Sequence, residues 1–287
     1  MWDNQYTNIV EIVKETLITA GSTFSDDKIR AYKRAIETET NERAKWVLQT
    51  VLENGYVAGK NRTPLCDDTG IPHLVLEIGK NRTISGEQIE AMHDGVREGL
   101  RALPGRPMAI MGKEWQRIDQ SGGLDQDPGA LLPAPLLIHY SENPDILRLH
   151  VLMFGGGPAI RGKTYRVFHK HDAETVKSEI VSWAKESVAQ LGCSPCTLTI
   201  GIGRSHYEAA SLMLKAQAFG NYDIQTDAEQ EITRRVNESN IGSLGLHGKI
   251  SVLSTFLMIG PQRASGVRIV CMRPSCCFEP RHACVDL

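Results

Sequence analysis

The chain has 287 residues and a mass of 31.7 kDa, enough to bury a substantial core in one large domain or two ordinary ones. Apolar residues make up 41% and charged residues 23%, so a disordered, fibrous or small disulfide-stapled protein is excluded. The net charge of -2 and the pI near 6.5 provide no electrostatic field that would recruit nucleic acid or an anionic membrane surface.

The sequence contains no run of about 18 apolar residues, and acidic residues stand near the N-terminus where a signal peptide would be basic and then apolar. We therefore expect a cytoplasmic protein with no membrane partner. In that compartment cysteines are expected to be metal ligands, catalytic groups or buried thiols and not disulfides. The chain has seven, Cys66, Cys193, Cys196, Cys271, Cys276, Cys277 and Cys284.

Helical patterns dominate the N-terminal part of the chain. Ser25 followed by Asp26 and Asp27 is typical of a helix N-terminus, and apolar residues then recur at helical spacing as far as Gly59. One or two helices are therefore predicted, within an N-terminal helical segment of about residues 1–62.

The stretch PLCDDTG follows these helices and places Cys66 directly before two aspartates and a Thr-Gly turn. A strand is predicted next, over residues 72–79, and then a helix from Ser85 to about Leu103. The Cys66 motif thus lies on a loop between a helix and a strand, where reactive groups are usually displayed.

The middle of the chain, residues 120–140, is rich in Gly, Pro and Asp and is predicted to be a long irregular connection. A strand over residues 146–154 follows and runs into Gly155, Gly156 and Gly157. Three glycines let backbone amides approach a ligand closely, although a plain turn explains them equally well.

The second cysteine loop repeats the placement of the Cys66 loop. A helix capped by Asp172 and ended by Gly192 precedes Cys193, and a strand over residues 197–203 follows it. Both loops therefore connect a helix to a strand.

Closer to the C-terminus, Ser205 is expected to cap one more helix. Strands are predicted over residues 251–259 and 266–272. They lead to PSCCFEPRH, which carries the adjacent Cys276 and Cys277.

Several chemistries compete for these cysteines. A redox site at Cys193-x-x-Cys196 is disfavoured because this motif follows a helix and precedes a strand, the reverse of a thioredoxin-like site. A four-cysteine zinc site needs two spaced pairs, whereas Cys276 and Cys277 are adjacent and are expected to point apart, so zinc is a second-rank alternative. A Cys-His nucleophile built on Cys66 has no supporting flanking signature.

Three cysteine loops far apart in sequence, each beside glycines or a turn, suit an iron–sulfur cluster held by three thiolates. When only three thiolates hold a cubane cluster, its fourth iron has no protein ligand. That iron can act as a Lewis acid toward a substrate hydroxyl. The carboxylate of Asp68 would then be placed beside the reacting atoms as a proton-transfer group.

These motifs resemble those of the class I, iron–sulfur fumarases and L-tartrate dehydratases. LCDDTG resembles the family's C-Q-D-T-G, and the triple glycine after a strand matches its triple-glycine stretch. Cys193-Ser-Pro followed by TLTIGIG resembles C-P-P followed by G-V-G-I-G, and PSCCFEPR resembles C-W-A-x-R, with Arg281 four residues after Cys277. The resemblance covers nearly the whole chain and corresponds to the α subunit, or to the N-terminal part of the fused forms.

The resemblance implies an α+β fold of antiparallel sheets with surrounding helices, in a single domain over residues 1–287. It also implies a 4Fe–4S cluster. The implied cluster ligands are Cys66, Cys193 and Cys277, with Cys276 as the neighbouring alternative for the third.

The resemblance further implies substrate contacts. Asp68 is the implied catalytic group, and Arg106 is similar to the family's arginine that grips a substrate carboxylate, the alternative being a solvated surface arginine. Asp67 stands where the family carries Gln, and a carboxylate repels a substrate carboxylate where an amide would donate to it. The glycines implied at the substrate are Gly155, Gly156 and Gly157.

The family's remaining catalytic groups lie in a β subunit, so the resemblance implies an oligomeric enzyme active only with that partner. The implied reaction is the reversible dehydration of a small hydroxy-dicarboxylic acid of the malate/fumarate or tartrate/oxaloacetate type. A non-catalytic cluster- or zinc-binding homologue and a hydro-lyase for an unusual substrate are the alternatives.

Overall fold

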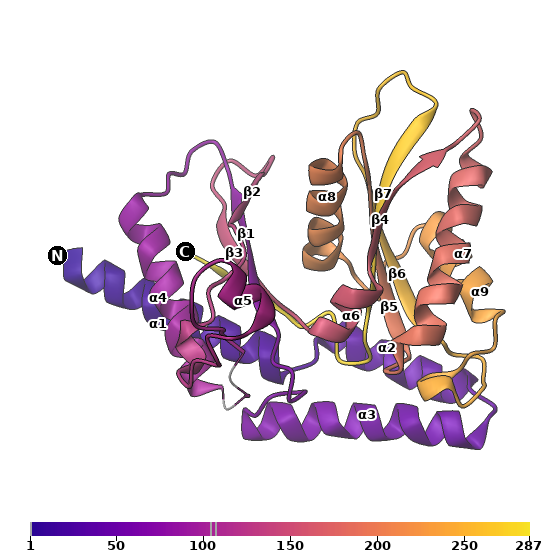
Figure 1. The fold of residues 1–287 in the computed structure, drawn as a ribbon, viewed down its shortest axis with the longest axis horizontal. Coiled ribbons are helices and arrows are strands. Elements are labelled where there is room, and N and C mark those ends of the chain that lie inside the picture. The colour runs from indigo at the N-terminus through magenta and orange to yellow at the C-terminus, as the bar shows by residue number, and fades with distance from the viewer. Residues whose placement is uncertain (1, 104, 107) are drawn as a thin grey trace. The chain divides into compact units, whose positions relative to one another are not determined.

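Short strands alternate with helices along the chain and gather into two four-stranded sheets (Figure 1). The computed structural model describes residues 2–287 except 104 and 107, with side chains from residue 5 onward. The predicted α+β class is confirmed. Both sheets are mainly antiparallel, as predicted, but each has one parallel pair at an edge, β1 with β2 and β5 with β6.

The chain divides into two compact units, which we call unit 1 and unit 2. Unit 1 consists of Met1–Thr23, Val57–Gly155 and Arg281–Leu287, and unit 2 of Phe24–Tyr56 and Gly156–Pro280. The prediction of one domain over the whole chain stays a prediction.

Unit 1 is built on the sheet β2–β1–β3–β8, in which β3 pairs with β1 on one side and with β8 on the other. The strands are β1 (Ile71–Ile78), β2 (Leu137–Tyr140), β3 (Leu147–Phe154) and β8 (His282–Asp286). The helices are α1 (Trp2–Ser22), α4 (Gly86–Ala102), the short α5 (Trp115–Asp119) and the 3₁₀ turn Pro128–Ala130.

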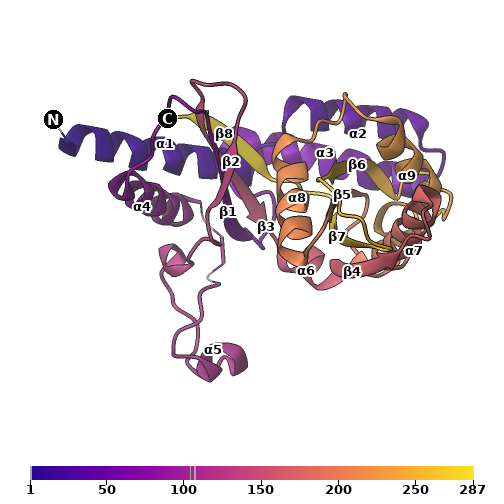
Figure 2. The same cartoon turned by 90° about the horizontal axis from the view of Figure 1, so that it is seen from above.

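One face of this sheet forms the core of unit 1. Leu149 and Val151 of β3 are fully buried, together with Val13 of α1 and Val96 of α4. Helices α1 and α4 pack against each other, as Figure 2 shows. The predicted start of α4 at Ser85 is confirmed, because its hydroxyl and the Gln88 side chain form a capping box.

Two strands of unit 1 differ from the sequence-based expectation. Residues 137–140 form the edge strand β2 and are not irregular, and β8 was not predicted at all. Each has only four or five residues, and each is held by pairing with a strand distant in sequence, β1 for β2 and β3 for β8. Such pairing leaves little local signal.

Unit 2 is built on the sheet β4–β7–β5–β6. The strands are β4 (Lys163–Phe168), β5 (Cys196–Gly203), β6 (Val252–Ile259) and β7 (Val267–Ser275). The helices are α2 (Asp26–Thr38), most of α3 (Glu42–Asn61), α6 (Gly156–Arg161), α7 (Ala173–Leu191), α8 (His206–Phe219), α9 (Asp227–Asn237) and the 3₁₀ turn Ser243–Gly245.

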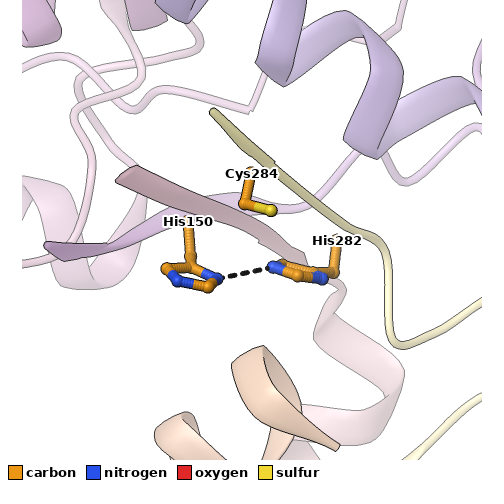
Figure 3. Close-up of side chains that lie close together, drawn as sticks. All are labelled: His150, His282 and Cys284. Atoms are coloured by element: carbon orange, nitrogen blue, oxygen red, sulfur yellow. Dashed lines mark hydrogen bonds between the residues drawn. The ribbon is translucent and has the colours of Figure 1, made fainter. Parts of the chain in front are cut away.

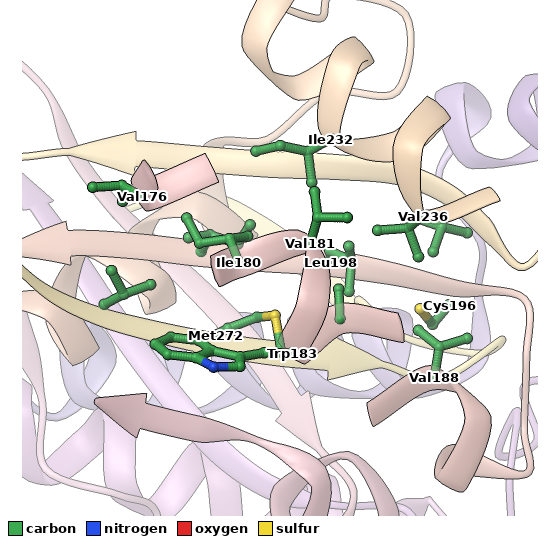
Figure 4. Close-up of a cluster of buried hydrophobic side chains, with 14 of the residues drawn as sticks. Val176, Ile180, Val181, Trp183, Val188, Cys196, Leu198, Ile232, Val236 and Met272 are labelled. Atoms are coloured by element: carbon green, nitrogen blue, oxygen red, sulfur yellow. The ribbon is translucent and has the colours of Figure 1, made fainter. Parts of the chain in front are cut away.

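Helix α7 supplies much of the core of unit 2. Its Ile180 and Val188 pack with Leu198 of β5 and Ile232 of α9 (Figure 4). Helix α8 packs closely on β5 at Gly201, where a Cβ atom would lie 2.1 Å from the carbonyl oxygen of Ala209. Among the described residues no helix is long and apolar enough to cross a membrane.

Candidate functional site

The loop that carries Cys66 connects α3 to β1 in unit 1, as predicted. Leu65 is buried, and its N–H donates to the carbonyl of Gly21 at 3.0 Å. Thr69 is also buried, and its N–H donates to the carbonyl of Asp67 at 3.1 Å. The loop is therefore held on both sides of the Cys-Asp-Asp sequence.

Arg281 fixes the backbone at the second aspartate. Its side chain is buried, and Nη1 donates to the carbonyl oxygen of Asp68 at 2.6 Å. The N–H of Met153 in turn donates to the carbonyl of Arg281 at 3.0 Å. Cys66 and Asp68 are half-buried and Asp67 is exposed, so the loop presents both carboxylates toward solvent to different degrees.

Gly70 ends this loop in a conformation that only glycine adopts easily, with a φ of +88°. A Cβ atom here would lie 2.7 Å from the backbone carbon of Phe154 and 2.7 Å from Nη2 of Arg281. Gly70 thus allows the loop to pass directly against β3 and the arginine that anchors it.

We predict that Gly70→Ala destabilises the protein by more than about 1–2 kcal/mol, because the positive φ and the backbone contact add their costs. Urea unfolding measures the loss. Gly86→Ala is the matched control, since a Cβ atom there would meet nothing within 4 Å. Equal stability of both variants would show that the loop tolerates a side chain at residue 70.

Arg106 and Asp67 lie close together in unit 1, with Nη1 of the arginine 3.4 Å from Oδ2 of the aspartate. The approach of the two segments is tight, because a Cβ atom at Gly105 would lie 2.1 Å from the side chain of Thr69. Both charged side chains are mostly exposed, so solvent screens the ion pair. The sequence predicted both residues near a substrate but did not predict that they contact each other.

The three predicted glycines fall at the end of β3 and the start of α6. Gly156 and Gly157 are the first residues of this short helix, so the plain-turn interpretation is wrong. A Cβ atom at Gly157 would meet nothing within 4 Å. A role of Gly155, Gly156 and Gly157 at the substrate stays a prediction.

The other two cysteine loops meet in unit 2. The N–H of Cys277 donates to the carbonyl of Cys193 at 2.9 Å, although 84 positions separate them in the numbering (277 minus 193). Tyr32, fully buried on α2, donates its hydroxyl to the carbonyl of Cys277 at 2.6 Å. The structure therefore brings together two of the three predicted cluster ligands, while Cys66 belongs to unit 1.

The thiols in unit 2 influence one another. Cys276 and Cys277 were expected to point apart, but their thiols form a hydrogen bond, which with burial and the nearby Cys193 raises the pKa of Cys277. Adjacent side chains diverge in a regular strand, whereas these two residues follow the end of β7. Thiols that lie this close together can bind one metal centre, because the cation offsets the repulsion between neighbouring thiolates.

A buried lysine lies near these thiols and was missed by sequence reasoning. Lys28 is 1% exposed, its ammonium lies 4.4 Å from the ring centre of Phe24, and its charge lowers the pKa of Cys277. The signal that could have found it is helical periodicity, because Lys28 shares the buried face of α2 with Ala31 and Tyr32. A positive charge here favours thiolate ligands and an anionic cluster.

The last cysteine loop is also held by a buried ion pair that the sequence did not reveal. Nη2 of Arg273 lies 3.0 Å from Oε2 of Glu279, and the side chains are 6% and 0% exposed. These residues bracket Cys276 and Cys277 on either side. Buried charges of this kind persist only when they are paired, so the pair fixes the path of the loop.

Cys196, in contrast, is 0% exposed in the core of unit 2, and burial raises its pKa strongly. A thiol that stays protonated is a poor nucleophile, which agrees with the low rank of the redox interpretation. No disulfide joins any cysteine in the described part of the chain.

Comparison with known proteins identifies the family. The model of the fumarate hydratase (Fumerase) family matches residues 10–286. The chain therefore belongs to this family, and the resemblance drawn from its motifs is confirmed.

Two curated relatives extend the comparison. The protein named "Putative L(+)-tartrate dehydratase subunit alpha" from Methanocaldococcus jannaschii is 26% identical over 290 residues, covering 96% of each chain. The protein named "Putative fumarate hydratase class I" from Geobacillus stearothermophilus is 23% identical over 263 residues, covering 85% of this chain but 48% of its own length. The alignment thus spans nearly the full length of the first relative and about half the length of the second.

Proposed function

We propose that the chain is the α subunit of a 4Fe–4S-dependent hydro-lyase that reversibly dehydrates a small hydroxy-dicarboxylic acid of the malate/fumarate or tartrate/oxaloacetate type. The observation that carries this proposal is the family match over residues 10–286. The hydrogen bond between the Cys193 and Cys277 loops supports it, since thiolates of one cluster must lie close together.

In this proposal Cys66, Cys193 and Cys277 hold the cluster, which supplies, when bound, an open iron as a Lewis acid for the substrate hydroxyl. The crowded thiols of unit 2 and the buried ammonium of Lys28 suit such a group. That Cys66 of unit 1 completes the ligand set is part of the proposal.

Asp68 acts as the proton-transfer group of the proposed reaction. Its carbonyl is anchored by Arg281, and its side chain is half-buried. The carboxylate takes or gives a proton at the carbon beside a substrate carboxylate, or at the leaving hydroxyl. Arg281 is a positioning residue, since it holds the backbone and not the reacting atoms.

Arg106 binds a substrate carboxylate in this proposal, and Asp67 competes with that carboxylate. The guanidinium already lies 3.4 Å from Asp67, so a dicarboxylate must displace the internal partner or share the arginine with it. The arrangement favours a substrate that tolerates a nearby carboxylate, for example through an additional hydroxyl that donates to Asp67.

We predict that Asp67→Gln lowers the KM for a dicarboxylate by up to about fivefold, the range expected when an exposed ion pair of up to about 1 kcal/mol is removed. The decrease in KM should become smaller as the salt concentration rises, because salt screens the ion pair. Steady-state kinetics of the complex with malate and with tartrate measures it. Glu142→Gln is the control, since this exposed residue lies at the end of β1 opposite to the Asp67 loop. A higher KM in Asp67→Gln would show that Asp67 itself binds substrate.

The proposed β subunit supplies the rest of the active site. Helix α5 lies on an extended segment of unit 1 (Figure 2). Several large apolar side chains of this segment are exposed, as expected of a surface that another subunit covers. These residues are Met111, Trp115, Ile118 and Leu124. The name of the Methanocaldococcus relative, a subunit alpha, supports the same proposal.

The decisive experiment is anaerobic purification with the candidate β subunit, followed by iron, sulfide and zinc analysis and assays on a panel of hydroxy-acids. About four irons and four sulfides per copy of this chain, with turnover of malate or tartrate, are expected. Stoichiometric zinc without sulfide would contradict the proposal in favour of a zinc-binding homologue. A loaded cluster with turnover only of another hydroxy-acid would correct the substrate class, and Asp67 is the feature that motivates this alternative.

A further inference from the structure

The sheet of unit 1 has a second face, opposite the core, that gathers metal-binding side chains. His150 of β3 pairs directly with Cys284 of β8, and Leu152 pairs with His282. Since paired residues of antiparallel strands point to one face and alternate residues share it, His150, His282 and Cys284 all project from the same side. Leu149 and Val151 point to the core.

The three side chains converge on one point, as Figure 3 shows. Nδ1 of His150 lies 3.0 Å from Nε2 of His282, and the two rings are within 11° of parallel. One nitrogen from each histidine and the sulfur of Cys284 lie within 4.8 Å of one another.

A carboxylate lies behind His150. Nε2 of the histidine is 3.5 Å from Oε2 of Glu77 on β1, and Oε1 of Glu77 accepts a hydrogen bond from Ser141 at 2.6 Å. A carboxylate on Nε2 favours the tautomer with the proton there and leaves the lone pair of Nδ1 toward His282 and Cys284. Metal-ligating histidines characteristically have such a partner on their second nitrogen.

Burial and charge also suit a metal ligand. His150 is 4% exposed, and contacts with His282 on one ring nitrogen and Glu77 near the other fix the orientation of its imidazole. Arg148, the nearest cation along β3, is paired with Asp286 at 2.6 Å. His282 is half-buried and Cys284 exposed, so these two side chains have room to adjust around a fixed His150.

We propose that His150, His282 and Cys284 form a binding site for a zinc-class divalent ion, separate from the cysteines of the proposed cluster. Two imidazoles and one thiolate are borderline-soft donors that favour zinc over magnesium or calcium, and a water completes four-coordination. Tetrahedral zinc places its nitrogen and sulfur donors about 3.3–3.7 Å apart, so small side-chain rotations suffice.

Metal binding also changes where the ligand side chains carry their protons. The Cys284 thiol loses its proton to solvent, and His282 carries its proton on Nδ1, which leaves the lone pair of Nε2 for the metal. The hydrogen bond between the two histidines is replaced by two bonds to the ion.

The ion joins the C-terminal strand β8 to the central strand β3. Because Arg281 directly precedes β8 and anchors the carbonyl of Asp68, the site also steadies the strand next to this anchor. Binding to the folded state alone raises stability by mass action, so zinc should protect the protein against unfolding.

Cobalt(II) titration of the full chain tests the site, because a thiolate bound to cobalt gives a charge-transfer absorption. The background carries Cys66→Ser, Cys193→Ser and Cys277→Ser, so that the proposed cluster ligands cannot contribute. We expect one equivalent of cobalt with this absorption, displaced by zinc. Adding Cys284→Ser should abolish the absorption, and Glu77→Gln should weaken binding by about 10- to 100-fold.

His139→Ala, on β2 of the same face, is the matched control and should bind as the background does. If the background unfolds, the native chain and Cys284→Ser are compared by zinc-induced change in melting temperature, which should rise only in the native chain. Binding that is unchanged by Cys284→Ser and His282→Ala, or equal melting shifts in both proteins, would overturn the proposal. Selective copper(II) binding with no response to zinc would overturn its metal class.

Discussion

Replacing either Cys193 or Cys277 by serine is expected to abolish the proposed 4Fe–4S cluster and reduce hydro-lyase turnover to background. A serine hydroxyl is a hard, weakly acidic donor that replaces a thiolate poorly on iron. The two residues are joined by a backbone hydrogen bond that does not involve their side chains, so the loops should keep their positions in both variants. Iron and sulfide content and the absorption spectrum of anaerobically reconstituted protein measure the loss.

Cys276→Ser is the control for this experiment. Residue 276 is adjacent to Cys277, and the substitution removes one thiol from the group that Cys276 forms with Cys277 and Cys193. It should retain the cluster, because its side chain packs against the apolar core of unit 2. A cluster that survives Cys277→Ser and is lost in Cys276→Ser would show that the third ligand is the neighbouring residue. Cys66→Ser should lose the cluster, as the other two ligand variants do. A normal cluster in that variant would show that Cys66 is not a ligand.

The elements that could be predicted from the sequence are those with local signals. Helix α4 begins with a capping box at Ser85, and α7 begins at its cap Asp172 and ends before Gly192, as expected. Strands β2 and β8 were missed because their partners lie far away in sequence, and a four- or five-residue edge strand has too few residues to show a period of two.

At the candidate site, too, features with a local sequence signal were predicted and features that depend on long-range contacts were not. The sequence predicted that Cys66 and Cys193 lie on loops between a helix and a strand, because helix ends and strand starts are locally encoded. It did not predict the contact of Asp67 with Arg106, which depends on how Gly105 packs against Thr69.

Buried charges were the hardest features to foresee. Lys28, Arg273 and Glu279 read as ordinary solvated residues unless the partner that compensates each charge is known. For Arg273 and Glu279 that partner is the other residue, six positions away and across the turn that follows β7 (279 minus 273). The cluster of His150, His282 and Cys284 was likewise missed, since only the pairing of β3 with β8 brings its members together.

The contact that Arg281 makes in the structure could not be predicted from its position in the sequence motif. Its place four residues after Cys277 belongs to the resemblance, but its guanidinium holds the carbonyl of Asp68 in unit 1. The backbone segment directly before β8 and the Cys66 loop are thereby held together within unit 1. A change at Arg281 should therefore disturb the backbone at Asp68.

Asp68→Asn is expected to lower the turnover of the complex by about 10²- to 10⁴-fold, as the loss of a general acid–base group typically does. The amide has the shape of the carboxylate but cannot accept or release a proton at neutral pH. The anchor from Arg281 reaches the backbone oxygen, so the loop and the cluster content should be unchanged.

The measurement is kcat with malate and with tartrate, together with the iron content and the pH profile of the same preparations. If Asp68 is the proton-transfer group, kcat falls while iron content stays constant, and the limb of the pH profile that belongs to this group disappears. If Asp68→Asn loses iron as well, the carboxylate supports the cluster and not the chemistry. Turnover equal to that of the native complex would show that Asp68 only forms the turn and does not transfer the proton.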